Sequence, residues 1–152
     1  MNELLESTLI KLHQLISPVS EDWMLIGTTS LYLQGYPVTP HDIDILCSSE
    51  VAEQIGQILL PHLIVSSEPV SKEKFRSNFS RYCLDGITIE LMGDLEVYTT
   101  DGWIKLKEQI HKGETLLFKG HLFKVPSKND QFKIYQLFGR QKDQKVLEIL
   151  SC

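Results

Sequence analysis

The chain has 152 residues, of which 42% are apolar and 23% charged, so we expect one globular domain spanning residues 1–152 rather than a disordered or fibrous protein. Its formal net charge of −5 excludes the broad basic surface that binds duplex DNA. The three cysteines are odd in number and lack CxxC spacing, which indicates neither a disulfide framework nor a zinc site and favours a reducing, cytoplasmic location.

The first segments predict a helix, a strand and a short second helix. Apolar residues recur at helical spacing over 4–16, and the absence of a long apolar run argues against a secretory signal or a membrane span. Residues 23–26 form a short apolar run that stops at Gly27, as a buried strand would. The hydroxyls of residues 28–30 are then expected to cap a short helix that ends at Gly35.

An acidic strand is predicted next, because residues 41–46 alternate between polar and apolar side chains. Asp42 and Asp44 then project from one face, roughly 6.5–7 Å apart along the strand, while Ile43 and Ile45 face the core. Two carboxylates on one face repel each other unless a cation lies between them, and hard divalent cations take such oxygen ligands. The alternative is an exposed strand face on which both acids are solvated.

Residues 48–78 predict a helix, a strand and a loop. Ser48 or Ser49 is expected to cap the helix, and residues 63–65 indicate the strand. Residues 66–78 are polar and irregular, which favours a mobile loop. Its basic side chains either neutralise a phosphate or simply belong to a solvated loop: Lys72, Lys74 and Arg76.

The dipeptide Asp85-Gly86 is the clearest turn signal, and it predicts a two-residue hairpin that joins residues 81–84 to 87–92. In that register Arg81 lies opposite Glu90, and directly opposed residues share a face of the sheet. Glu90 therefore points away from the core and is a candidate third carboxylate. The alternative is an ordinary cross-strand ion pair between Glu90 and Arg81.

The remaining chain predicts a second hairpin and a helical end. Lys119-Gly120 is expected to join strands over 115–118 and 121–125. Residues 129–150 indicate one or two helices with a break near Gly139. Since no repeat, low-complexity tract or linker interrupts the sequence, we do not divide the chain.

These motifs together resemble the signature of the nucleotidyltransferase superfamily. The resemblance implies an α/β (α+β) fold, in which a mixed β-sheet is flanked by helices and followed by a short C-terminal helical segment. Two residues depart from the family pattern, since Thr28 stands where glycine or serine is usual and Glu90 where aspartate is usual. The matching runs are Gly27-Thr28-Thr29-Ser30, Asp42-Ile43-Asp44 after Thr39, Ile89-Glu90-Leu91 and, for some members, Arg140-Gln141-Lys142-Asp143.

The resemblance implies metal-dependent transfer of a nucleoside monophosphate from a nucleoside triphosphate to a hydroxyl acceptor, with release of pyrophosphate. Asp42, Asp44 and Glu90 would be the catalytic acids and would hold Mg²⁺ or Mn²⁺, and Glu90 is also a candidate general base. Contacts to the nucleotide phosphates are implied for Gly27, Thr28, Ser30, Arg81 and Lys142. The sequence identifies neither the nucleotide nor the acceptor, which is a small molecule, a protein or an RNA end.

Other possibilities remain open. A catalytically weak relative would bind nucleotide or a protein partner without transfer, which the departures at Thr28 and Glu90 favour. A second subunit could complete the site in a homo-oligomer. A phosphohydrolase with an aspartate nucleophile matches less well, because that chemistry would want an apolar strand leading straight into the first aspartate, whereas Pro40-His41 precedes Asp42.

Overall fold

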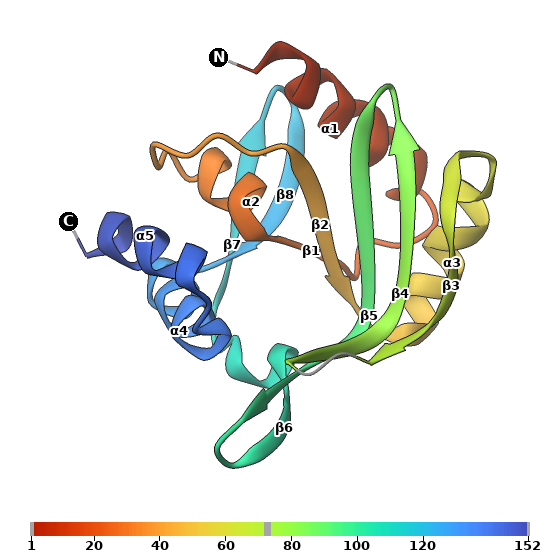
Figure 1. The fold of residues 1–152 in the computed structure, drawn as a ribbon. Coiled ribbons are helices and arrows are strands. Elements are labelled where there is room, and N and C mark those ends of the chain that lie inside the picture. Colours follow the sequence, from red (N-terminus) through yellow and green to blue (C-terminus); the bar gives the residue numbers. More distant parts are fainter. Residues whose placement is uncertain (1, 72–73, 152) are drawn as a thin grey trace.

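A mixed six-stranded sheet forms the centre of the computed structural model, which describes residues 2–71 and 74–151, with the backbone alone over 65–71 (Figure 1). The strand order is β1-β2-β5-β4-β3, and β6 pairs with the end of β5. Strands β2 and β5 run parallel, and the other neighbours run antiparallel. The strands are β1 (Met24–Ile26), β2 (Asp42–Cys47), β3 (Leu63–Ser71), β4 (Phe75–Leu84), β5 (Ile87–Thr99) and β6 (Gly102–Lys105).

Helices flank this sheet, and a separate hairpin of β7 (Gly113–Phe118) and β8 (His121–Pro126) packs beside β1. The arrangement is the mixed α+β fold that the sequence predicts. No helix in the described ranges is long and apolar enough to cross a membrane. The helices are α1 (Glu3–Ile16), α2 (Gly27–Leu33), α3 (Ser49–Leu59), α4 (Lys128–Phe138) and α5 (Gln141–Leu150), with 3₁₀ turns η1 (Leu60–His62) and η2 (Leu106–Gln109).

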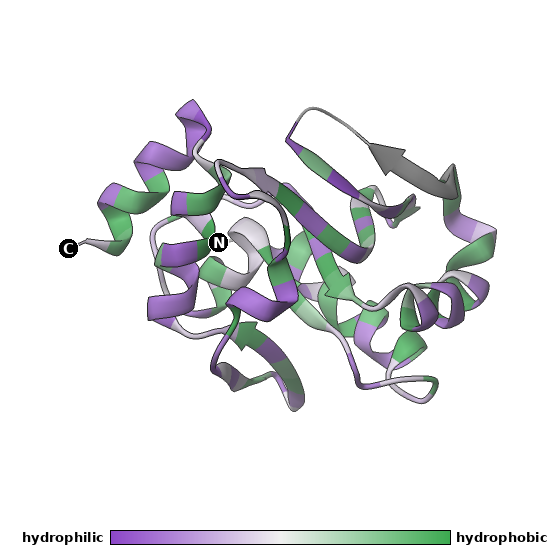
Figure 2. Cartoon of the chain, turned by 90° about the horizontal axis from the view of Figure 1, so that it is seen from below, coloured by the Kyte–Doolittle hydropathy of each residue, from purple (hydrophilic) through white to green (hydrophobic). Residues whose placement is uncertain are grey.

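Two apolar cores lie on opposite faces of the sheet. The first joins α1 and α3 to the inward side chains of β2, β4 and β5, and the second joins α2, α4 and α5 to the ends of β2 and β5. The helices that build them carry apolar residues on one side and polar residues on the other (Figure 2). Because Ile43, Ile45, Ile89 and Leu91 belong to the first core, the residues between them must face the second side.

Both predicted hairpins are confirmed. The register places Arg81 opposite Glu90, as the two-residue turn requires. A turn of this length needs left-handed backbone at both positions, and the asparagine-like tolerance of aspartate and the freedom of glycine supply it at 85–86. The turn residues all have positive φ: Asp85 51°, Gly86 83°, Lys119 47° and Gly120 84°. The predicted break between the last helices is also confirmed, at Gly139 with φ 60°.

The predicted loop over 66–78 is wrong. Strand β3 extends to Ser71, β4 begins at Phe75, and the two pair antiparallel. Strand β3 lies at the edge of the sheet, where polar side chains are tolerated because one side of the strand remains open. The polarity that suggested a loop is therefore that of an edge strand. Lys72 lies outside the described residues.

The predicted cap of the second helix is also wrong. Helix α2 begins at Gly27, with Ile26 as the residue before it and no side-chain cap. The hydroxyl of Thr29 donates instead to the carbonyl of Asp42 at 2.5 Å, and that of Ser30 donates to the carbonyl of Gly27 at 2.6 Å. These two bonds tie the turn and α2 to the start of β2.

Candidate active site

The acidic residues predicted from the sequence come from two neighbouring strands. Asp44 and Glu90 are register partners in the parallel pair β2–β5, and Asp42 lies two residues before Asp44 on the same face. This is the face opposite the first core. Asp42 is exposed, Asp44 is partly buried, and the Glu90 side chain is 22% exposed. The fold thus gathers all three acids on one side of the sheet.

The turn at Gly27 closes directly over Asp44. A Cβ atom placed on Gly27 would clash with Asp44 Oδ2, and the φ of Gly27 is +72°. Both the close approach and the left-handed backbone therefore require glycine. Beneath this turn, Asp44 Oδ1 is buried and has no hydrogen-bond partner in the part of the chain that the structure describes. A buried carboxylate oxygen without a partner is costly, and a bound cation would satisfy it.

The fold also raises the pKa of Asp44. Burial, and then the charges of Glu90 and Asp42, raise the pKa of Asp44 to about 7, whereas the Lys142 ammonium opposes this rise. Near neutral pH the metal-free site therefore holds a proton where a cation would bind. A carboxyl group perturbed by both burial and like charges is typical of functional sites.

Glu90 is held in place by Arg81. The Nε and Nη2 atoms of Arg81 donate to Glu90 Oε2 at 3.2 and 2.8 Å, and the guanidinium lies 5.2 Å from the centroid of the Phe79 ring. The ion-pair interpretation of Glu90 is thus correct, and it coexists with the position of Glu90 beside Asp44. The sequence also suggested Arg81 as a phosphate ligand. This contact stays a prediction, and it would compete with the ion pair to Glu90.

The hydroxyl of Ser30 does not face a ligand. Ser30 is fully buried, and its Oγ accepts a hydrogen bond from Gln131 Nε2 at 2.9 Å while donating to Gly27. A phosphate contact by the Ser30 side chain stays a prediction, and it would have to replace one of these two hydrogen bonds. Thr28 is half-buried at the same turn, and its predicted contact with a phosphate stays a prediction.

The C-terminal run Arg140-Gln141-Lys142-Asp143 divides into structural and solvent-facing parts. Arg140 Nε and Nη2 donate to the two carboxylate oxygens of Asp143 at 2.7 and 3.0 Å, and the Arg140 guanidinium lies 5.0 Å from the Phe138 ring. This pair closes the first turn of α5. Lys142 remains exposed, and its charge acts on Asp44.

The other basic candidate in the described strands is likewise paired elsewhere. Arg76 donates to Glu96 from Nε and Nη2 at 3.2 and 3.0 Å and stacks on Trp103 at 4.2 Å. It therefore belongs to a cross-strand cluster of β4, β5 and β6. A phosphate contact by Arg76 would therefore compete with its ion pair to Glu96.

Sequence reasoning missed the contribution of α4. Burial, and then the charges of Asp44 and Asp143, raise the pKa of Tyr135, so this buried phenol of α4 is influenced by the acidic site. Gln131, four residues earlier and therefore on the same helical face, anchors α4 to α2 through Ser30 and Gln34. The sequence shows polar residues on the apolar face of the predicted helix. It does not show that tertiary packing brings this face of α4 near the site.

The donor set suits a hard divalent cation in part. Asp42 and Asp44 offer carboxylate oxygens, one of which is buried without a partner, and Mg²⁺ commonly uses one or two carboxylates with phosphate and water. Across residues 2–71 and 74–151, however, no three His, Cys, Asp or Glu side chains gather closely enough to hold a metal ion. Glu90 is held by Arg81 rather than grouped with both aspartates.

Comparison with known proteins decides the family. The model of the aminoglycoside-2″-adenylyltransferase family matches residues 8–150. The chain belongs to this family. Family membership and fold support nucleotide transfer as its general chemistry, with a nucleoside triphosphate as substrate; relatives generally use a divalent metal.

Solved structures resemble this adenylyltransferase-family protein over most of its length. A Thermotoga maritima protein assigned as a nucleotidyltransferase is 29% identical, with a TM-score of 0.79, and the match covers 93% of this chain and 89% of that one. The lincosamide antibiotic adenylyltransferase LnuA, bound to lincomycin, is 14% identical with a TM-score of 0.61 and 96% of both chains covered, which shows a shared fold. No curated protein sequence matches the chain.

Proposed function

We propose that the protein transfers a nucleoside monophosphate from a nucleoside triphosphate to an acceptor hydroxyl and releases pyrophosphate. The observation that carries the proposal is Asp44 Oδ1, which is buried without a partner among the described residues, beneath the Gly27 turn and beside two further carboxylates. An adenylyltransferase family model over residues 8–150 supports the same chemistry. The family description makes ATP the first nucleotide to test and an aminoglycoside hydroxyl the first acceptor.

Asp42 and Asp44 are the residues that would hold a divalent cation, Mg²⁺ or Mn²⁺. Such an ion lowers the pKa of an acceptor hydroxyl and stabilises the attacking and leaving oxygens of an in-line displacement. Asp42 contributes from the exposed side, and Asp44 contributes from beneath Gly27. Asp44, whose pKa is raised by burial and the neighbouring acids, would lose its proton when it holds the cation.

Glu90 is the group in position to accept a proton from the acceptor hydroxyl. Arg81 binds Glu90 Oε2 through both donors, so the rotation of the carboxylate is restricted. A base with a fixed orientation needs less reorganisation during proton transfer. The oxygen that loses this proton then attacks the α-phosphorus, the bond to the pyrophosphate oxygen breaks, and pyrophosphate leaves.

The triphosphate is proposed to lie between the Gly27 turn and α5. Gly27 permits close approach of a phosphate to the backbone, and the Thr28 hydroxyl stands at the same turn. The exposed Lys142 ammonium, whose field already reaches Asp44, would neutralise phosphate charge.

The test is to incubate the protein with labelled ATP, CTP, GTP or UTP, Mg²⁺ or Mn²⁺ and a panel of aminoglycosides, and to measure pyrophosphate release. Asp44→Asn should abolish release while the protein stays folded. Asp94→Asn is a matched control, because Asp94 is exposed at a position with φ 52°, which asparagine tolerates. Equal release by the wild type and Asp44→Asn would refute the proposal.

The second candidate function is nucleotide binding without transfer. It is favoured by the absence of a three-residue metal group among the described side chains and by the commitment of Glu90 to Arg81. Calorimetric binding of a nucleoside triphosphate without any pyrophosphate release, across all acceptors tested, would support this function instead.

A further inference from the structure

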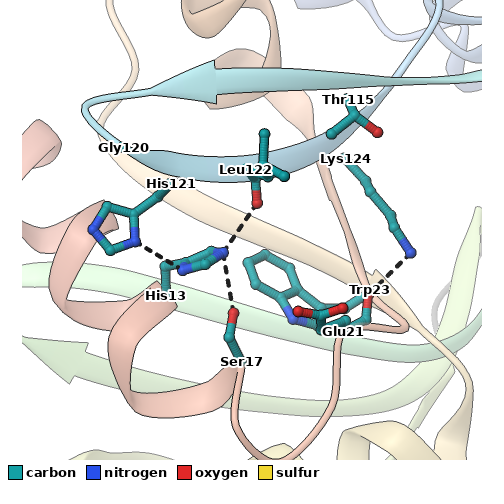
Figure 3. Close-up of a pocket in the computed structure, with 9 residues that line it drawn as sticks. All are labelled: His13, Ser17, Glu21, Trp23, Thr115, Gly120, His121, Leu122 and Lys124. Atoms are coloured by element: carbon teal, nitrogen blue, oxygen red, sulfur yellow. Dashed lines mark hydrogen bonds between the residues drawn. The ribbon is translucent and has the colours of Figure 1, made fainter.

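A surface hollow of about 290 Å³ lies where the end of α1, the segment before β1 and strand β8 meet (Figure 3). None of the three acids of the candidate active site lines it. Two histidines from distant parts of the sequence, His13 and His121, meet at its edge. The residues that line it are His13, Ser17, Glu21, Trp23, Thr115, Gly120, His121, Leu122 and Lys124.

The ring of His13 is fixed in one tautomer. Its Nε2 lies 3.0 Å from the carbonyl oxygen of Leu122, which can only accept, so Nε2 carries the proton and Nδ1 presents a lone pair. The Ser17 hydroxyl lies 3.0 Å from the same Nε2 and can accept from it as well. The hydrogen bond from Nε2 to the Leu122 carbonyl therefore leaves Nδ1 available.

The Nδ1 atom of His121 lies 3.0 Å from this lone pair. The two rings meet edge to face, with an interplanar angle of 73°. The lone pairs of two imidazole nitrogens repel each other at this distance unless one nitrogen carries a proton or both bind a metal ion. Without metal, the Nδ1–H of His121 donates to His13, along the dashed line between the two rings in Figure 3.

We propose that these two nitrogens chelate one divalent transition-metal ion of the Ni²⁺ or Cu²⁺ class. For metal–nitrogen distances of about 2.0–2.1 Å, a nitrogen separation of 3.0 Å corresponds to an angle of roughly 90–97° at the metal. That is the cis angle of tetragonal and octahedral sites, whereas tetrahedral zinc would need a separation of roughly 3.4 Å. Metal-bound histidines usually donate their other N–H to a carbonyl or carboxylate, as His13 does to Leu122.

The remaining coordination positions belong to water or to an external ligand, because no third histidine, cysteine or acid joins the pair within the described chain. The ion displaces the proton shared by the two rings, so its affinity weakens as the pH falls. The charged groups that line the same hollow are Glu21 and Lys124, and the Lys124 ammonium donates to the Glu21 carbonyl at 3.2 Å. Binding would fasten the last turn of α1 to β8.

The test measures thermal unfolding of untagged protein with added Ni²⁺ or Cu²⁺, in excess Mg²⁺ to compete for the carboxylates. The unfolding temperature of the wild type should rise with metal concentration, because a ligand that binds the folded state stabilises it. His121→Gln should lose this rise. His111→Gln, which removes an exposed histidine outside the hollow, should keep it.

A second measurement does not depend on any variant. The electron paramagnetic resonance spectrum of the Cu²⁺ complex should show splitting from two nitrogen atoms. No rise in the wild type, an equal rise in His121→Gln, or splitting from fewer than two nitrogens would overturn the proposal.

Discussion

Gly27 is the single residue on which the geometry of the acidic site depends most directly. Replacement by alanine would bring Cβ into a clash with Asp44 Oδ2 and would also impose left-handed backbone on a residue with a side chain, which costs about 1–2 kcal/mol. We expect Gly27→Ala to lower the unfolding temperature and to abolish transfer. Gly35→Ala separates the two causes, because Gly35 has φ +92° but a Cβ added to it would meet nothing within 4 Å.

Comparison of the two alanine variants by thermal unfolding and pyrophosphate release then isolates the close approach. Gly35→Ala should lose stability through backbone strain alone and should keep its activity. Equal activity in both variants would show that the contact between Gly27 and Asp44 has no role in transfer.

The titration of Asp44 gives a second prediction at the scale of the residue. Its pKa is about 7 in the folded protein against an ordinary value of 3.8, so the folded state binds the extra proton more tightly between these pH values. The metal-free protein therefore loses stability through Asp44 as the pH rises from about 4 to about 7. A cation competes with that proton, so Mg²⁺ should raise the unfolding temperature more at about pH 8 than at about pH 5.

Asp44→Asn supplies the control for this pH dependence, because it removes the titrating carboxyl group. The variant should be more stable than the metal-free wild type above about pH 7 and should respond less to Mg²⁺. An identical Mg²⁺ effect at both pH values in the wild type would contradict a cation at Asp44.

At the scale of elements, the β4–β5 hairpin carries two similar arginine–carboxylate pairs with different expected roles. Arg81 grips Glu90 beside the acidic site, and Arg76 grips Glu96 next to Trp103. Lysine cannot reproduce the two-donor grip. We expect Arg81→Lys to lower kcat by about 10²-fold, the effect of misplacing a catalytic group by about 1 Å, with little change in KM for the nucleotide.

Arg76→Lys is the matched control, because it also removes a two-donor arginine–carboxylate pair from the same strand pair. Arg76 donates to both oxygens of Glu96, whereas Arg81 donates twice to one oxygen of Glu90. Its kcat should stay near the wild-type value, and both variants should have similar unfolding temperatures. A parallel loss of kcat in the two variants would mean that Arg81 acts only on the stability of the hairpin.

The same hairpin shows how far the sequence predicts this fold. A two-residue turn fixes the register, so the Arg81–Glu90 pair follows from Asp85-Gly86 alone. The parallel pairing that places Glu90 beside Asp44 is non-local, and no sequence pattern predicted it. The family resemblance implied only that Glu90 joins the two aspartates. The burial of Ser30 and the position of Tyr135 depend on how α4 packs against α2 in the second core. This packing is not visible in the sequence.

At the scale of the whole molecule, the acidic site lies on one face of the sheet. Gly27 of α2 and Lys142 of α5 act on Asp44 at one end, and the same face continues onto β4. Cys83 tests how far a bound nucleotide extends over this face. It is exposed on β4 opposite Thr88, and Thr88 is the register partner of Asp42. The thiol of Cys47 is buried, and burial raises its pKa to about 12, so it should not react.

In the Cys152→Ser variant, alkylation should therefore report on Cys83 alone. A nucleoside triphosphate with Mg²⁺ should slow this reaction if the nucleotide or the acceptor covers the face between β2 and β4. The nucleotide without Mg²⁺ should protect Cys83 less, because the carboxylates then repel the phosphates. Asp44→Asn in the same background should remove the protection. Alkylation rates that are unchanged by nucleotide, Mg²⁺ and acceptor together would confine any bound ligand to the α2–α5 end of the sheet, away from β4.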